Sequence, residues 1–145
     1  MTVLIGVDES TYSNAAVEFV KKTPWPKDTR FLVVSASPPV FMGPGEAAAA
    51  PGAIAQVIQA QEAFHTELAG RAAAALGKAG LKAEARMVPA DPRMAIVDTA
   101  RKEGAELIIV GSHGRSGFSK LLLGSVASHV IAHAHCNVLV VKQPT

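Results

Sequence analysis

Apolar residues along this chain follow two kinds of spacing. Five short apolar runs, rich in β-branched residues and bounded by turn signals, predict strands of a buried sheet. They lie at residues 2–7, 30–36, 81–88, 106–110 and 137–142. In residues 81–88 small or apolar side chains alternate with Lys82, Glu84 and Arg86, which indicates a strand with one wet face near a sheet edge.

The segments between these runs have helical spacing. Four helices are predicted, over residues 8–22, 54–80, 92–104 and 121–134. Ser10 is a candidate N-cap of the first helix, and Asp91 followed by Pro92 is a candidate start of the third, because such side chains accept hydrogen bonds from the first helical turn. Pro24 and Gly104 end the corresponding patterns.

Residues 37–53 contain four prolines and three glycines, which predicts a loop despite a run of alanines. A connection of this length is unusual in a compact domain and is often a functional lid or a mobile segment. Phe41 and Met42 fit either a lid or a plain connector, and the sequence leaves both interpretations open.

The alternation of strands and helices predicts an α/β fold, with a doubly wound five-stranded parallel sheet and helices on both faces. Neither a repeat nor a second domain is evident, so one domain is expected over residues 1–145. In such sheets ligands bind at the carboxyl ends of the strands. This rule brings Val7, Asp8, Ser35, Asp91 and Gly111 to one rim.

Composition narrows the class of partner. The formal net charge is +2 and the basic residues are scattered, so nucleic-acid binding is not expected. Cys136 is the only cysteine, which excludes an internal disulfide and favours a reducing compartment. No apolar run approaches membrane-spanning length and the first strand has no basic leader, so we expect a cytoplasmic protein without a membrane partner.

Residues 110–126, VGSHGRSGFSKLLLGSV, hold the strongest candidate chemistry. The stretch follows a strand and leads into a helix, so backbone N–H groups can converge on an anion, and Arg115 adds a bidentate charge. Phosphate is the expected ligand. The glycines fit neither a Walker A loop nor the G-x-G-x-x-G fingerprint. The helix can also begin near Gly124 rather than at residue 121.

The spacing Gly111, Gly114 and then Gly124-Ser125 resembles the nucleotide-binding signature of the universal stress protein family. The first strand followed by Asp8, Ser10 and Ser13 is similar to the family's opening motif, and the resemblance extends over nearly the whole chain. It implies strand order 3-2-1-4-5, ATP and Mg²⁺ as ligands, and a homodimer.

The resemblance also implies roles for single residues. The backbones of Gly111, Gly114 and Gly124 would hold the phosphates with Ser125, beside Arg115, and Val126 would complete that turn. Val7 and Asp8 would border adenine and ribose, and Asp8 would also lie near Mg²⁺. Ser35 would lie on the adenine side, where the family often has an apolar residue.

Several residues allow a plainer interpretation. Asp8 could cap the first helix instead of contacting a ligand. His129 and His133 have a metal-binding spacing but no acidic partner, so a packed or solvated helix end is favoured. Ser112 and His113 do not form the G-x-S-x-G elbow of a hydrolase.

The last strand is apolar on both faces, so residues 137–142 are expected to pair with another copy in a two-fold dimer. Because no general base stands out, the favoured function is a dimeric ATP-binding regulator of the stress response with at most slow hydrolysis. Two alternatives remain: a dimeric interaction module that binds no nucleotide, and a slow ATPase or nucleotidyl-type enzyme.

Overall fold

The computed structural model describes residues 1–49, 51–114 and 122–143. Its five strands are β1 (Thr2–Gly6), β2 (Arg30–Ala36), β3 (Lys82–Val88), β4 (Leu107–Gly111) and β5 (Asn137–Val141). All neighbouring strands pair in parallel, in the order β3-β2-β1-β4-β5. The predicted sheet and its strand order are therefore confirmed, including the edge position of β3 and β5.

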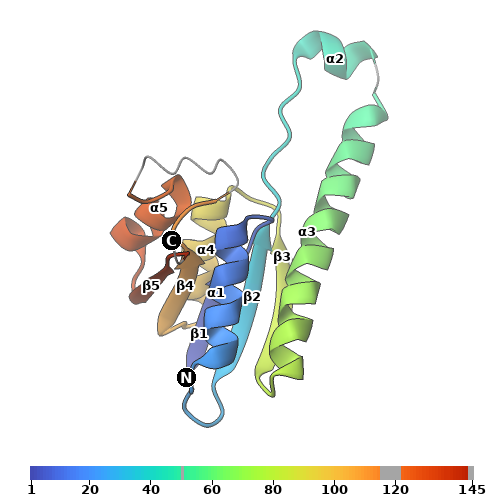
Figure 1. Ribbon diagram of the computed structural model, residues 1–145. Helices are drawn as coiled ribbons and strands as arrows, with labels where there is room; N and C mark the ends of the chain where they lie inside the picture. Colours follow the sequence, from blue (N-terminus) through green and yellow to red (C-terminus); the bar gives the residue numbers. More distant parts are fainter. Residues whose placement is uncertain (50, 115–121, 144–145) are drawn as a thin grey trace.

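Helices cover both faces of this sheet (Figure 1). One face packs against α1 (Thr11–Lys22) and α3 (Ala53–Lys78), and the other against α4 (Pro92–Lys102) and α5 (Ser125–His133). Successive side chains of a strand point to opposite faces. Val3 and Ile5 accordingly join the core under α1 and α3, while Leu4 joins the core under α4 and α5.

Local capping signals set where two of the helices begin. Ser10 Oγ accepts a hydrogen bond from the Ser13 N–H over 3.1 Å, which confirms Ser10 as the N-cap of α1. Asp91 caps α4 by accepting from the Arg93 N–H, with Pro92 at the first helical position. The Arg93 guanidinium also bonds this carboxylate and holds the pKa of Asp91 below its ordinary value.

The prediction of a loop over residues 37–53 is wrong in part, because a short helix α2 (Pro44–Ala49) forms within it. Pro44 stands at the first helical position, and the Gly43 N–H donates to Glu46 Oε2 over 3.2 Å. Proline at this place and a glutamate that reaches back to the preceding turn are helix-start signals. These signals were not recognised in the sequence because the many prolines and glycines around them favoured a loop.

The last helix is shorter than predicted. Leu122, Leu123 and Gly124 are not helical, and α5 begins at Ser125, so the alternative start near Gly124 is correct. Gly124 has an extended backbone, and its N–H donates to the carbonyl oxygen of Ser112 over 2.7 Å. This bond ties the start of α5 to the segment that leaves β4.

Helix α3 is the longest element, and its first half reaches beyond the carboxyl edge of the sheet towards α2 (Figure 1). Its buried residues lie at or after the middle of the helix: His65, Ala69, Ala73 and Leu76. Among the described residues, no helix is both long and apolar enough to cross a membrane.

Candidate functional site

A cavity of about 330 Å³ opens at the carboxyl ends of β1, β2 and β4, where the direction of strand succession reverses. Such switch points are the usual ligand sites of doubly wound sheets. The cavity is lined by Gly6, Val7, Asp8, Ser13, Val34, Ala36, Pro38, His65, Pro92, Ile96, Val110, Gly111, His113, Gly114, Ser125 and Val126. Six of the nine residues implied by the family resemblance therefore line this cavity: Val7, Asp8, Gly111, Gly114, Ser125 and Val126.

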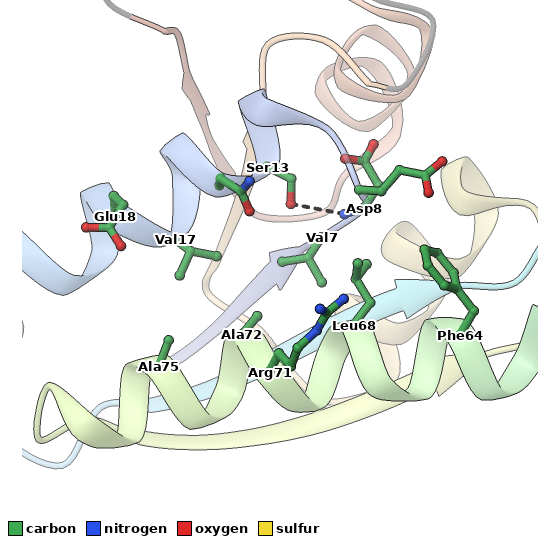
Figure 2. Close-up of a pocket in the computed structure, with 12 residues that line it drawn as sticks. Val7, Asp8, Ser13, Val17, Glu18, Phe64, Leu68, Arg71, Ala72 and Ala75 are labelled. Atoms are coloured by element: carbon green, nitrogen blue, oxygen red, sulfur yellow. Dashed lines mark hydrogen bonds between the residues drawn. The ribbon is translucent and has the colours of Figure 1, made fainter.

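Asp8 lies in the turn between β1 and α1, where hydrogen bonds fix both its backbone and its side chain. Its N–H donates to Ser13 Oγ over 3.0 Å (Figure 2), and its Oδ1 accepts from the Ser10 N–H over 2.8 Å. Because Ser10 caps the helix, Asp8 is not the cap. Its Oδ2 lies 3.1 Å from the point where a Cβ on Gly114 would stand, so this oxygen faces the glycine segment.

A single carboxylate such as Asp8 suits Mg²⁺ that is held mainly by phosphate oxygens and water, which is the usual arrangement for this ion. Within residues 1–49, 51–114 and 122–143, no group of three or more His, Cys, Asp or Glu could hold a metal ion by itself. A contact between Asp8 and Mg²⁺ stays a prediction that depends on a bound nucleotide.

Gly111 and Gly124 are required by packing. A Cβ on Gly111 would lie 2.8 Å from the carbonyl carbon and oxygen of Tyr12, in the first turn of α1. A Cβ on Gly124 would lie 3.0 Å from the Cα of His113. Gly111 therefore lets α1 approach β4 closely, and Gly124 lets the start of α5 approach the segment that follows β4.

The first turn of α5 faces the cavity with backbone N–H groups. Gly124 occupies the N-cap position, and no described side chain caps this helix. The N–H groups of Ser125 and Val126 belong to the first turn, where an α-helix offers no acceptor of its own. Both residues line the cavity, so the positive end of the helix dipole is directed at it.

Ser35, which was predicted on the adenine side, lies near the carboxyl end of β2. It is fully buried and is not among the lining residues. Its Oγ lies 2.8 Å from Nδ1 of His65, which is itself 5% exposed and does line the cavity. The histidine of α3 therefore forms this part of the wall, and a direct ligand contact by Ser35 stays a prediction.

Sequence reasoning missed several lining residues, chiefly His65, Pro38 and Ile96. One signal for His65 was present in the sequence. It lies four residues before Ala69, so both residues belong to the side of α3 that is buried against the sheet. Arg115, implied beside the phosphates, lies outside the described residues, as do Gly117 and Lys120.

A second and larger hollow, of about 530 Å³, lies between α1 and α3 (Figure 2). Val17, Leu68, Ala72 and Ala75 give it an apolar floor, and Arg71 extends into it from α3. It shares Val7, Asp8 and Ser13 with the smaller cavity but contains none of the glycines that carry the predicted phosphate chemistry. The smaller cavity is therefore the candidate site.

The other candidates have local explanations. The rings of His129 and His133 stack with centroids 4.1 Å apart, and His133 Nδ1 lies 2.9 Å from the His129 carbonyl oxygen. Ser112 is 2% exposed, with its Oγ 3.1 Å from His113 Nδ1. Burial raises the pKa of the Cys136 thiol.

Comparison with known proteins establishes the family. The model of the universal stress protein family matches residues 1–142. This chain belongs to the universal stress protein family. Universal stress protein MJ0531 of Methanocaldococcus jannaschii is 48% identical over 65 residues, which cover 45% of this chain and 38% of that protein. Universal stress protein Slr1101 of Synechocystis is 39% identical over 64 residues, 44% of this chain and 59% of that protein.

These matches span about two fifths to three fifths of the curated relatives, whereas the solved structures match over nearly their full length. The structure of hypothetical protein MJ0577 has a TM-score of 0.85 at 24% identity and covers 99% of this chain and 96% of its own. A universal stress protein in complex with cAMP has a TM-score of 0.67 at 26% identity, covering 99% and 98%. One from Archaeoglobus fulgidus in complex with dAMP has a TM-score of 0.66 at 21% identity, covering 98% of both chains.

Proposed function

We propose that this protein is a single-domain regulatory protein of the stress response that binds ATP with Mg²⁺ in the cavity at the carboxyl ends of β1, β2 and β4. The observation that carries the proposal is the open first turn of α5, whose Ser125 and Val126 line the same cavity as Asp8 and Gly114. Phosphates bind at such helix starts because free N–H groups and the helix dipole both favour an anion.

The lining of the cavity combines polar backbone groups with apolar side chains, which supports a nucleotide rather than a simple anion. The phosphates would lie against the Gly114 backbone and α5, with Arg115 adding positive charge. Ala36, Pro38 and Ile96 offer an apolar surface for a base. Two family members of the same fold were solved with cAMP and dAMP, which supports an adenine nucleotide.

Binding is a better fit to this cavity than rapid catalysis. A general base must reach a water molecule aligned on the terminal phosphate. Asp8 is the residue proposed to contact Mg²⁺, and His113 Nδ1 lies 3.1 Å from Ser112 Oγ. Hydrolysis is therefore expected to be slow at most.

A charge placed at the start of α5 tests the phosphate assignment. Ser125→Glu puts a carboxylate where the phosphates would bind, yet an acidic residue in a first helical turn does not harm the helix. Binding of Mg-ATP, measured by calorimetry, should be lost while the melting temperature of the free protein is kept. Ser128→Glu, an exposed position one turn further along α5, is the matched control and should bind like the parent.

The nucleotide released from denatured, freshly purified protein gives an independent readout. The released nucleotide is expected to be ATP or ADP. Unchanged binding by Ser125→Glu would contradict the phosphate assignment. If denaturation releases no nucleotide and the parent protein does not bind Mg-ATP, the results would instead favour an interaction module that works without nucleotide.

We also propose a cytoplasmic homodimer formed through the β5 edge. The apolar residues Val138, Leu139, Val140 and Val141 stay partly exposed, and an open apolar strand edge invites pairing with another copy. Sedimentation velocity over a dilution series should detect the dimer. A monomer at every concentration would contradict this part of the proposal.

A further inference from the structure

The larger hollow, between α1 and α3, has room for a small molecule. Its volume of about 530 Å³ falls within the range of about 300–1,000 Å³ that is usual for ligand sites. The space exists because the side chains that face one another across it are short: Ala72 and Ala75 of α3 face Val17 of α1 (Figure 2). The two alanines are only half-buried, so apolar surface is left uncovered there.

The apolar floor of the hollow is elongated. Leu68, Ala72 and Ala75 follow one another at helical spacing, so they lie along one side of α3. From Leu68 to Ala75 this strip is about 10 Å long, at about 1.5 Å per residue. Val7 and Val17 complete the floor from β1 and α1. Such a strip suits an extended aliphatic chain better than a compact ligand.

Arg71 supplies the positive charge of this hollow. It is the only basic residue among the described residues that line it, and its exposed side chain extends from α3 into the hollow (Figure 2). No hydrogen bond or ion pair to another described residue engages its guanidinium. Helical side chains lean towards the N-terminus of their helix, which directs the guanidinium to the Leu68 end of the floor. Its planar fork matches the geometry of a carboxylate.

The carboxylates that line the hollow do not compete strongly for this role. Glu18 accepts a hydrogen bond from Lys21 Nζ over 2.6 Å, and Lys21 lies outside the hollow. The Oδ2 atom of Asp8 faces Gly114, which belongs to the smaller cavity. Glu9 is exposed, so water and salt screen its charge. The guanidinium is therefore the charged group that a ligand on the apolar floor would meet.

We propose that this hollow is a second ligand site, which binds an aliphatic carboxylate. The carboxylate pairs with Arg71, and the chain lies over the floor towards Ala75. A charge-assisted bidentate pair and the removal of apolar surface from water then act on the same ligand. The inference goes beyond the proposed function and does not depend on a bound nucleotide. Because Val7, Asp8 and Ser13 line both cavities, the two sites are neighbours.

Octanoate and octylammonium are the first pair of probes, because they share a chain length and carry opposite charges. Calorimetry with the full chain should show binding of octanoate and binding of octylammonium that is weaker by about tenfold or more. Butyrate lacks four methylene groups and should also bind about tenfold more weakly than octanoate, or less. The first comparison tests the pairing with the guanidinium, and the second tests the apolar floor.

Arg71→Met removes the charge and keeps an unbranched apolar side chain. It should weaken octanoate binding by about five- to tenfold, as expected for a charge-assisted pair at a partly exposed position. Arg101→Met is the matched control, because Arg101 is an exposed arginine of α4, on the other face of the sheet. This control should bind octanoate like the parent.

Ala75→Leu fills part of the floor and tests the same site without changing its charge. Octanoate binding should weaken, while the melting temperature of the free protein should equal or exceed that of the parent, since the larger side chain covers apolar surface. Nuclear magnetic resonance then locates the probe. Octanoate should shift the amide signals of Val17 and Leu68 most, and those of Ser125 and Val126 in the smaller cavity least.

Octanoate binding of equal strength in the parent, Arg71→Met and Ala75→Leu would overturn this inference, as would amide shifts centred on Ser125. The absence of octanoate binding would overturn it too. If Ala75→Leu then also weakened self-association in sedimentation velocity, a second copy of the chain would be the occupant of the hollow. None of these results bears on Mg-ATP binding, and loss of the proposed nucleotide function would leave this inference standing.

Discussion

Substitution of Gly111 by alanine tests the close packing of α1 on β4. Gly111 is the last residue of β4, and an added Cβ would lie 2.8 Å from the carbonyl carbon and oxygen of Tyr12 and 2.9 Å from its Cβ. Two of these three atoms are backbone atoms of a helix and cannot rotate away. The φ angle of Gly111 is not in the left-handed region, so the cost of the substitution is steric rather than conformational.

The expected loss of stability in Gly111→Ala follows from how far α1 and β4 must move apart. Non-bonded carbon atoms rest at about 3.5 Å or more, so α1 and β4 must separate by roughly 0.7 Å. Overpacking of this kind costs about 2–3 kcal/mol of the free energy of unfolding. For a chain of this size, the melting temperature should fall by roughly 5–12 °C. Because Ser13 of α1 anchors Asp8, the affinity for Mg-ATP should fall as well.

Urea unfolding followed by circular dichroism measures this cost, with Gly70→Ala as the control. An added Cβ at Gly70, inside α3, meets no atom within 4 Å, so alanine should raise the free energy of unfolding by about 0.5–1 kcal/mol. The two glycine substitutions are therefore expected to act in opposite directions. A Gly111→Ala protein as stable as the parent would refute the packing argument.

Two further predictions concern local interactions. Ser10→Ala removes the N-cap bond to the Ser13 N–H and should lower the free energy of unfolding by about 1 kcal/mol in the same urea assay; no measurable change would mean that another group caps α1. Hydrogen bonds from Arg86 and Arg30 hold the pKa of Glu103 below its ordinary value of 4.5. These ion pairs therefore stabilise the folded protein fully above pH 4.5. Their contribution is lost as the pH falls through the lower pKa that Glu103 has in the folded state. Melting temperatures from neutral pH to pH 3 should therefore fall more steeply for the parent than for Glu103→Gln, and parallel curves would contradict this.

The strands and most helix starts could be predicted because their causes are local. A β-branched apolar run such as residues 2–7 describes a buried strand without reference to the rest of the chain. Ser10 and Asp91 cap helices whose first turns lie within three residues of them. The start of α2 was missed although Pro44 and Glu46 are local signals, because the surrounding prolines and glycines outweighed them in the prediction.

The rotation of α3 about its axis could not be predicted. The helical spacing in the sequence gives an apolar stripe through Val57, Ile58, Phe64, Leu68, Ala72, Ala75 and Leu76. Leu76 is buried in the core as this stripe predicts, but Phe64, Leu68, Ala72 and Ala75 line the hollow between α1 and α3 (Figure 2). The buried side of α3 runs through His65, Ala69, Ala73 and Leu76. A shift of one position rotates a helix face by about 100°, because an α-helix has about 3.6 residues per turn. Which side faces the sheet depends on how closely small residues such as Ala69 and Ala73 let the helix approach β2 and β3.

The sequence by itself determined the succession of strands and helices, the glycines of the nucleotide signature and the rim at which they gather. Only the tertiary structure decided which distant residues meet: Gly111 with Tyr12, Asp8 with Gly114, and Ser35 with His65. Periodicity and capping act over a few neighbouring residues and so leave a local pattern. Contacts between separate elements depend on the strand crossovers and on the rotation of each helix against the sheet, and no short stretch of sequence records these.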